Sequence, residues 1–308
     1  MINVEVEILK QGEPSKNVLS CSFFTTADKY REFEKYQVHL KEFLEQQRQL
    51  NDFEVRIYTD DSGKDFAVDA CKNYQNVSVY HYNCPEFKRG KWHVGMFGTL
   101  CRLLPLSEGL DLVWVSDIDV PQRFLNPAIL KHLDINTPIY IDTRVCSTSR
   151  KFGKRFPVIL HKFISKMQLP SFLLERFLTD LHEGRERQAI DYMNLINRQK
   201  PHSEAPYGID EYFLNTRIYE YIQARGIQCL VGKDYLNRAV MQKNSSEENK
   251  AILKHYFLTH DMAALPKVRE ILQEELPALI DDHPCCKETL DELANLQESS
   301  QVFYNTLI

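Results

Sequence analysis

The segment LVWVSDIDV, from Leu112 to Val120, decides the fold that we expect for this chain. Its first half is a short apolar run of the length of a buried β-strand, which we predict over residues 111–116. Two aspartates separated by one residue, Asp117 and Asp119, follow it directly. Ligands of open α/β sheets bind outside the carboxyl ends of the strands, so these carboxylates stand where a binding site is expected.

Short β-rich runs alternate with amphipathic stretches before this segment, which is typical of βαβ units around a mainly parallel sheet. Beyond about Lys151 the strand signals thin out and the sequence favours helices. We therefore predict an α/β, Rossmann-like sheet flanked by helices, followed by a mostly helical carboxyl-terminal half. The other expected strands are 17–24 (NVLSCSFF), 53–58 (FEVRIY), 77–82 and 138–142, and the expected helices are 29–50, 95–106, 156–181 and 185–197.

Length and composition limit the remaining choices. A chain of 308 residues is compatible with one α/β domain, in which 17–150 form the ligand-binding half and 151–308 a helical half with a tail. The formal net charge of -5 argues against nucleic acid as a partner, because phosphates require clustered Lys and Arg. Neither a signal segment nor an apolar run near the ~20 residues of a membrane span is visible, so we expect a cytoplasmic protein.

The pair Asp117 and Asp119 offers hard oxygen ligands of the kind that Mg²⁺ or Mn²⁺ prefers. A cation held there would bridge to phosphate and neutralise charge on a departing diphosphate. The alternative is that Asp-x-Asp forms a turn or a helix cap, which is common for aspartate. The buried strand before it and the α/β pattern favour the metal site.

The segment Gly95–Pro121, GMFGTLCRLLPLSEGLDLVWVSDIDVP, resembles the helix, strand and Asp-x-Asp block of GT-A glycosyltransferases. It is most similar to the glycogenin-like group and to related enzymes of bacteria and large viruses. In that group an arginine on the helix before the motif strand approaches the donor diphosphate or sugar, and Arg102 matches its place. The resemblance implies metal-dependent transfer from a nucleotide sugar, UDP-linked by analogy, to an unidentified glycan, protein or small-molecule acceptor.

The same resemblance, which covers residues 17–143, gives expected roles to the ends of other strands. The first strand ends at Phe24, Thr25 and Thr26, and in this fold that end lies against the nucleobase. Asp60 ends the next strand, where contacts to ribose or base are expected, and Asp117 is expected to contact the donor as well as the metal ion. Turn formation is the alternative for the polar residues of this set.

This chain departs from the glycogenin-like group by lacking its carboxyl-terminal His-x-x-Gly-x-x-Lys-Pro-Trp block, since its tryptophans are Trp92 and Trp114. A third metal ligand must therefore come from elsewhere. The late histidines His255, His260 and His283 are available, and we select His260 because it follows an apolar, strand-like run. A structural or solvent-facing role is the alternative for each.

A second group of acids, Asp210 and Glu211, follows Gly208 at the predicted start of a helix. Acids in a first turn are favoured by the helix dipole alone, so composition does not decide between structure and function. GT-A enzymes often place such a pair near the reacting sugar, and this segment resembles that arrangement. Either acid could deprotonate the acceptor in an inverting reaction or stabilise an oxocarbenium-like centre in a retaining one.

Two other classes of protein remain open. A haloacid-dehalogenase-like phosphohydrolase also carries Asp-x-Asp after a buried strand, and 279–282 (LIDD) imitates its later acidic motif, but Pro121 stands where that family usually has Thr or Val. The second open class is a non-catalytic sugar-binding or protein-binding module on a transferase scaffold.

The basic segment 88–93 (KRGKWH) is either a loop that closes over a diphosphate or a solvated loop.

Overall fold

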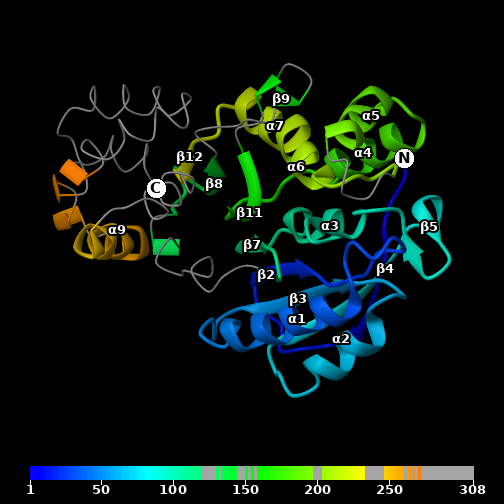
Figure 1. Ribbon diagram of the computed structural model, residues 1–308, viewed down its shortest axis with the longest axis horizontal. Helices are drawn as coiled ribbons and strands as arrows, with labels where there is room; N and C mark the ends of the chain where they lie inside the picture. Colours follow the sequence, from blue (N-terminus) through cyan, green and yellow to red (C-terminus); the bar gives the residue numbers. More distant parts are fainter. Residues whose placement is uncertain are drawn as a thin grey trace.

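The computed structural model describes residues 1–119, 130–131, 133–143, 150–151, 154–155, 158–196, 203–232, 246–259, 262–264, 266–267 and 270–271. Within this part of the chain, eight strands form one large sheet with helices packed on both of its faces (Figure 1). In spatial order the strands are β1 (Glu5–Lys10), β4 (Val77–Asn83), β3 (Glu54–Thr59), β2 (Asn17–Ser22), β7 (Leu112–Ser116), β11 (Val158–Ser165), β8 (Ile139–Thr143) and β12 (Cys229–Gly232).

Most neighbouring strands of the first half run parallel. β4, β3, β2 and β7 share one direction, and β12 is parallel to β8. β11 lies between β7 and β8 and runs antiparallel to both, and β1 is antiparallel to β4 at the edge. The predicted mainly parallel α/β sheet is therefore confirmed, with two reversed strands. Strands from the part of the chain before residue 150 and from the part after it belong to this one sheet.

The central strand β7 shows how the two layers of core form. Leu112 and Trp114 belong to the hydrophobic cluster under the first two helices, while Val113 and Val115 point into the cluster on the other face. Burial on both faces is what a strand between two helical layers requires. One layer contains α1 (Phe33–Gln47) and α2 (Lys64–Cys71); the other side holds α3 (Gly98–Cys101), α4 (Phe172–His182), α5 (Arg187–Ile196), α6 (Ile209–Phe213) and α7 (Tyr219–Ala224) (Figure 1).

The predicted helix 95–106 forms only as two short pieces. α3 spans Gly98–Cys101, and a 3₁₀ turn, η2, spans Leu104–Ser107. Pro105 lacks a backbone N–H and clashes with the preceding turn, so the α-helix cannot continue through it. Gly98 is the first residue of α3, and a Cβ there would lie 2.2 Å from the Tyr82 hydroxyl, so the position favours glycine.

The expectation of a helix over 156–181 is wrong for its first part. Val158–Ser165 forms β11, and helix begins only with α4 at Phe172. An eight-residue apolar run does not by itself distinguish a buried strand from a helix. Pairing with β7 on one side and β8 on the other decides in favour of the strand. β12 and the exposed edge strand β1 were not predicted either, whereas α5 confirms the helix expected over 185–197.

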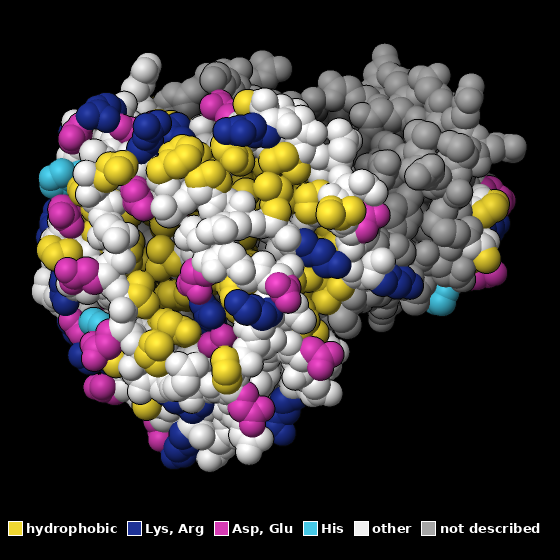
Figure 2. Space-filling model, turned by 180° about the vertical axis from the view of Figure 1, so that it is seen from behind, with side chains coloured by type: hydrophobic (Ala, Val, Ile, Leu, Met, Phe, Trp, Pro, Cys, Tyr) yellow, Lys and Arg dark blue, Asp and Glu magenta, His cyan; other side chains and the backbone are white. Residues whose placement is uncertain are grey.

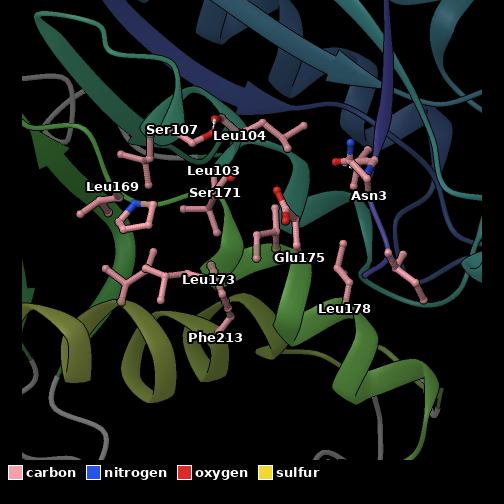
Figure 3. Close-up of a pocket in the computed structure, with 16 residues that line it drawn as sticks. Asn3, Leu103, Leu104, Ser107, Leu169, Ser171, Leu173, Glu175, Leu178 and Phe213 are labelled. Carbon is pink, nitrogen blue, oxygen red and sulfur yellow. Dashed lines mark hydrogen bonds between the residues drawn. The ribbon is translucent and has the colours of Figure 1, made fainter.

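Cavities lie along the edge of the sheet where the parallel strands begin. One of about 80 Å³ lies between the amino-terminal segment, η2 and α4, and is lined mostly by apolar side chains (Figure 3). Another of about 780 Å³ is lined by residues that include Asp111, before β7, and Lys166, after β11. On the face shown in Figure 2, acidic and basic side chains of the described residues are interspersed rather than gathered by sign.

Candidate functional site

The strand order reverses next to β2, and the carboxyl ends of β2 and β7 lie side by side. From β2 the chain proceeds outward through β3 to β4, and it then returns to the other side of β2 as β7. Such a reversal in strand order is a topological switch point, where the connections leave in opposite directions and ligands bind. Thr25 and Thr26 follow β2 here, and Asp117 and Asp119 follow β7. The structure thus brings the predicted strand-end residues to one edge.

Arg102 forms the centre of the charged group at this edge. Its side chain is 4% exposed, and its Nη1 donates to the carbonyl of Ser116 at 3.0 Å and to Oδ1 of Asp117. Nη2 donates to Oδ2 of Asp210 at 2.7 Å. The Ser20 hydroxyl of β2 in turn donates to the Arg102 carbonyl at 2.7 Å. One guanidinium therefore joins β7, α6 and, through its backbone, β2.

The charge on Arg102 is secured by its two partners. Burial alone disfavours a charged guanidinium, but Asp117 and Asp210 outweigh that effect and hold the pKa of Arg102 above its ordinary value. Its charge-assisted hydrogen bonds, one to each acid, also fix the direction of both carboxylates. Asp117 remains about one-third exposed, whereas the Asp210 side chain is 11% exposed.

Asp119 is exposed and lies beside an aromatic and cationic stack. The Tyr36 hydroxyl donates to Oδ2 of Asp119 at 3.5 Å, and the Arg31 guanidinium lies 3.9 Å from the centre of the Tyr36 ring. Burial raises the pKa of Tyr36 to about 12; Arg31 acts in the opposite direction and Asp119 adds to the rise. At neutral pH Tyr36 is therefore an uncharged donor. Tyr36 and Arg31 were not among the predicted site residues, and Tyr36 was expected only on the apolar face of the first helix.

The residues after β2 are largely enclosed. Phe24 is 2% exposed, and its ring lies 4.3 Å from Arg31, so it packs beneath the edge instead of lining it. The Thr26 hydroxyl accepts a hydrogen bond from the backbone N–H of Arg31 at 3.0 Å. The Thr25 hydroxyl accepts one from Nε1 of Trp92 at 3.2 Å. Both hydroxyls thus support the protein's own turns.

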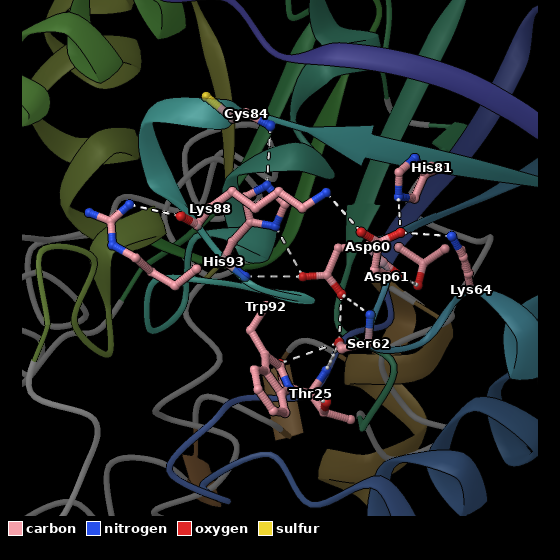
Figure 4. Close-up of polar contacts among 12 residues, drawn as sticks. Thr25, Asp60, Asp61, Ser62, Lys64, His81, Cys84, Lys88, Trp92 and His93 are labelled. Atoms are coloured by element: carbon pink, nitrogen blue, oxygen red, sulfur yellow. Dashed lines mark hydrogen bonds and ion pairs between the residues drawn. The ribbon is translucent and has the colours of Figure 1, made fainter.

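Asp60 is 1% exposed and ties three segments together (Figure 4). Its Oδ1 accepts from the backbone and hydroxyl of Ser62 at 3.0 and 2.5 Å, and its Oδ2 accepts from Nδ1 of His93 at 3.1 Å. The backbone N–H of Cys84 donates to Nε2 of His93 at 3.1 Å, which fixes the proton of a neutral His93 on Nδ1. Asp60 therefore has the turn-forming role that was the alternative to contacts with ribose or base. Both of its carboxylate oxygens accept hydrogen bonds from the protein itself.

The basic segment forms a two-stranded hairpin, β5 (Lys88–Arg89) with β6 (Trp92–His93). Lys88 pairs with Asp61 at 2.7 Å, and Asp61 also accepts from Lys64 at 2.7 Å. Arg89 lies 3.5 Å from Glu204 in an exposed pair. The hairpin is thus attached to the turn after β3, next to the end of β2.

Asp210 and Glu211 are presented by the start of α6. Gly208 precedes them with a φ of 83°, a left-handed conformation that favours glycine. Oδ1 of Asp210 accepts from the Glu211 N–H at 2.9 Å. Asn215, in a π-helical turn that follows α6, pairs with the backbone of Val158 at 3.1 and 2.8 Å. This contact anchors the helix to β11 and so places Asp210 beside Arg102.

The histidines proposed as a third metal ligand are not brought to this edge within the described residues. His255 is exposed on α9 (Glu247–Thr259), and His260 and His283 lie outside the described residues. No group of three or more His, Cys, Asp or Glu side chains is placed to hold a metal ion in the described part of the chain. Asp117 and Asp119 both follow the end of β7, and the expectation that His260 is a third ligand falls outside the described residues.

Comparisons with known proteins add no assignment. A scan against protein-family models and a search of curated proteins found no match for this chain. Among the described helices, none combines the length and the apolar character that crossing a bilayer requires. Any function assigned to this site must therefore rest on its geometry and on the motif at the end of β7.

Replacing Arg102 with Met is expected to destabilise the protein, because it leaves two carboxylates facing each other without their cation. Removal of one partner from a buried ion pair costs about 3–5 kcal/mol, and the low end applies here because Asp117 is partly exposed. Urea unfolding at pH 7 measures the loss. A variant as stable as the wild type at pH 7 would contradict the central role of Arg102.

The Asp61 cluster predicts a pH-dependent contribution to stability. Hydrogen bonds from Lys64 and Lys88 hold the pKa of Asp61 well below its ordinary value of 3.8. A carboxyl group with a lowered pKa stabilises the fold above pH 3.8, and this contribution disappears as pH falls toward the folded-state pKa. Asp61→Asn should therefore lose about 1 kcal/mol at pH 7, since the pairs are partly exposed, and the difference should narrow below pH 3.8. An equal difference at pH 7 and pH 2.5 would refute this account.

Proposed function

We propose that this chain is a metal-dependent GT-A glycosyltransferase that moves a sugar from a UDP-linked donor to a hydroxyl acceptor. The observation that carries the proposal is the position of Asp117 and Asp119 at the end of β7, beside the switch point next to β2. Asp117 is partly exposed and Asp119 is exposed, which suits a diphosphate-bridging cation at this edge of the sheet. The resemblance of 95–121 to the GT-A block supports the same class.

Asp117 and Asp119 would hold Mg²⁺ or Mn²⁺. When bound, such an ion supplies positive charge to the departing diphosphate. Tyr36 keeps Asp119 directed by its hydrogen bond, and Arg102 directs Asp117. Because the Arg102 guanidinium is buried against carboxylates, we assign it a positioning role in place of direct contact with the donor.

Asp210 and Glu211 would serve the sugar and the acceptor. Both oxygens of Asp210 already accept hydrogen bonds, one from Arg102 and one from the Glu211 N–H. Such a carboxylate is suited to stabilise positive charge at a fixed place. Glu211 is half-buried at the same helix start, and we assign it proton transfer with the acceptor hydroxyl.

Metal-dependent hydrolysis of UDP-sugars tests the class of enzyme, since a transferase without its acceptor can pass the sugar to water. Wild-type protein should release UDP with Mn²⁺ and stop in excess EDTA. Asp117→Asn and Asp119→Asn should each lower turnover by about a hundredfold or more, the scale on which loss of charge stabilisation acts. Asp111→Asn, before the opposite end of β7, is the matched control and should turn over normally.

The proposal would be abandoned if a panel of UDP-glucose, UDP-galactose and UDP-N-acetylglucosamine gave EDTA-insensitive turnover, or if Asp119→Asn matched the wild type. Metal-dependent cleavage of an aryl phosphate instead of any nucleotide sugar would indicate a phosphohydrolase. Metal-independent binding of a sugar without turnover would indicate a binding module.

The two acids of α6 can be separated by kinetics. Glu211→Gln should lower kcat about a hundredfold with a donor KM near the wild-type value, and should remove the acidic limb of the pH–rate profile. Asp210→Asn should raise the donor KM as well, because it frees the Arg102 guanidinium that directs Asp117. A wild-type kcat for Glu211→Gln would assign proton transfer elsewhere.

A further inference from the structure

The cavity of about 80 Å³ shown in Figure 3 lies away from the candidate site. Its lining includes Leu106, just before β7, and Leu169, just after β11, whose N–H donates to the Leu106 carbonyl at 2.7 Å. β11 runs antiparallel to β7, and Ser165 at its carboxyl end pairs with Val113 near the amino end of β7. The cavity is therefore at the opposite edge of the sheet from Asp117.

The lining of this cavity is apolar with one charged side chain. Leucines together with isoleucine, valine, proline and phenylalanine side chains form most of the wall, and Glu175 of α4 is the only charged residue among the described lining residues. Figure 3 shows its carboxylate directed toward the space that the lining side chains enclose. Asn3 and Ser171, which also line the cavity, are exposed and mark the side that opens to solvent.

Glu175 lacks a partner within the described part of the chain. Its side chain is half-buried and makes neither a hydrogen bond nor an ion pair with any described residue. The neighbouring cation, Arg176, is exposed and stacks at 5.2 Å over the ring of Phe172, which is not among the lining residues. Glu175 lies in the first turn of α4, where the helix dipole favours an acid, and a carboxylate that faces an apolar cavity from there can also pair with a cationic ligand.

Volume limits the size of that ligand. A water-sized position needs roughly 10–15 Å³ of such space, so a cavity of about 80 Å³ holds on the order of five to eight non-hydrogen atoms. A chain of four to six carbons with one amino group is of about this size. Ordinary drug-sized pockets are several times larger, which excludes a nucleotide or a sugar from this cavity.

We propose that this cavity is a binding site for a compact aliphatic ammonium ion. The alkyl part lies among the leucines, and the ammonium group donates to the Glu175 carboxylate near the mouth formed by Asn3 and Ser171. The proposal uses none of the residues assigned to metal or donor binding, and it stands or falls independently of the proposed transferase activity.

The probe is n-pentylammonium, and its matched control is 1-pentanol, which has the same chain and size without the charge. Titration of the wild-type protein, followed by isothermal calorimetry and by amide chemical shifts, should show saturable binding of the amine. 1-Pentanol should bind about tenfold or more weakly, since a hydrogen bond to a charged group contributes more than a neutral one. Glu175→Gln should remove this preference while binding 1-pentanol as the wild type does.

A variant that fills the cavity distinguishes binding of the ligand inside it from an ion pair with Glu175 at the surface. Leu104→Phe, at a half-buried lining position, should weaken both ligands, whereas Asp111→Asn should weaken neither. Matching circular dichroism spectra and unfolding midpoints would show that each variant is folded. The assignment is overturned if the amine does not saturate, if Glu175→Gln binds it as tightly as the wild type, or if Leu104→Phe leaves its affinity unchanged.

Discussion

A single buried cation organises the candidate site. The Arg102 guanidinium holds Asp117 at the end of β7 and Asp210 at the start of α6, although these two acids lie far apart in the sequence. Two carboxylates so close would repel each other in a partly dry environment without that charge. The Ser20 hydroxyl fixes the backbone of the same arginine to β2. Loss of the Arg102 side chain therefore releases both Asp117 and Asp210.

The fold supplies the rest of the arrangement through strand order. Because β2 and β7 are adjacent and parallel, their carboxyl ends are neighbours, while the connections that follow them diverge. Asp60, His93 and Ser62 secure the adjoining turn, and Asn215 anchors the start of α6 to β11. Buried hydrogen bonds thus support the turns and the helix start that carry the candidate residues.

The sequence predicted the local features better than the tertiary ones. The buried runs before Asp117 and Thr25 and the amphipathic helix α1 follow from apolar periodicity, which depends on neighbours in the chain. β11 was mistaken for helix because its identity depends on two strands that flank it. Two further contacts join segments that are distant in the sequence. They are the ion pair of Arg102 with Asp210 and the hydrogen bond of His93 to Asp60. No local pattern reveals such contacts.

The central claim is that Asp117 and Asp119 jointly hold a cation that also binds the diphosphate of a nucleotide. Anomalous diffraction from crystals soaked with Mn²⁺ and UDP tests it most directly. The account predicts one strong manganese peak in direct contact with a carboxylate oxygen of each aspartate and with the UDP phosphates, while Arg102 still bridges Asp117 and Asp210. UDP bound elsewhere, or an ordered site with no manganese beside either aspartate, would contradict it.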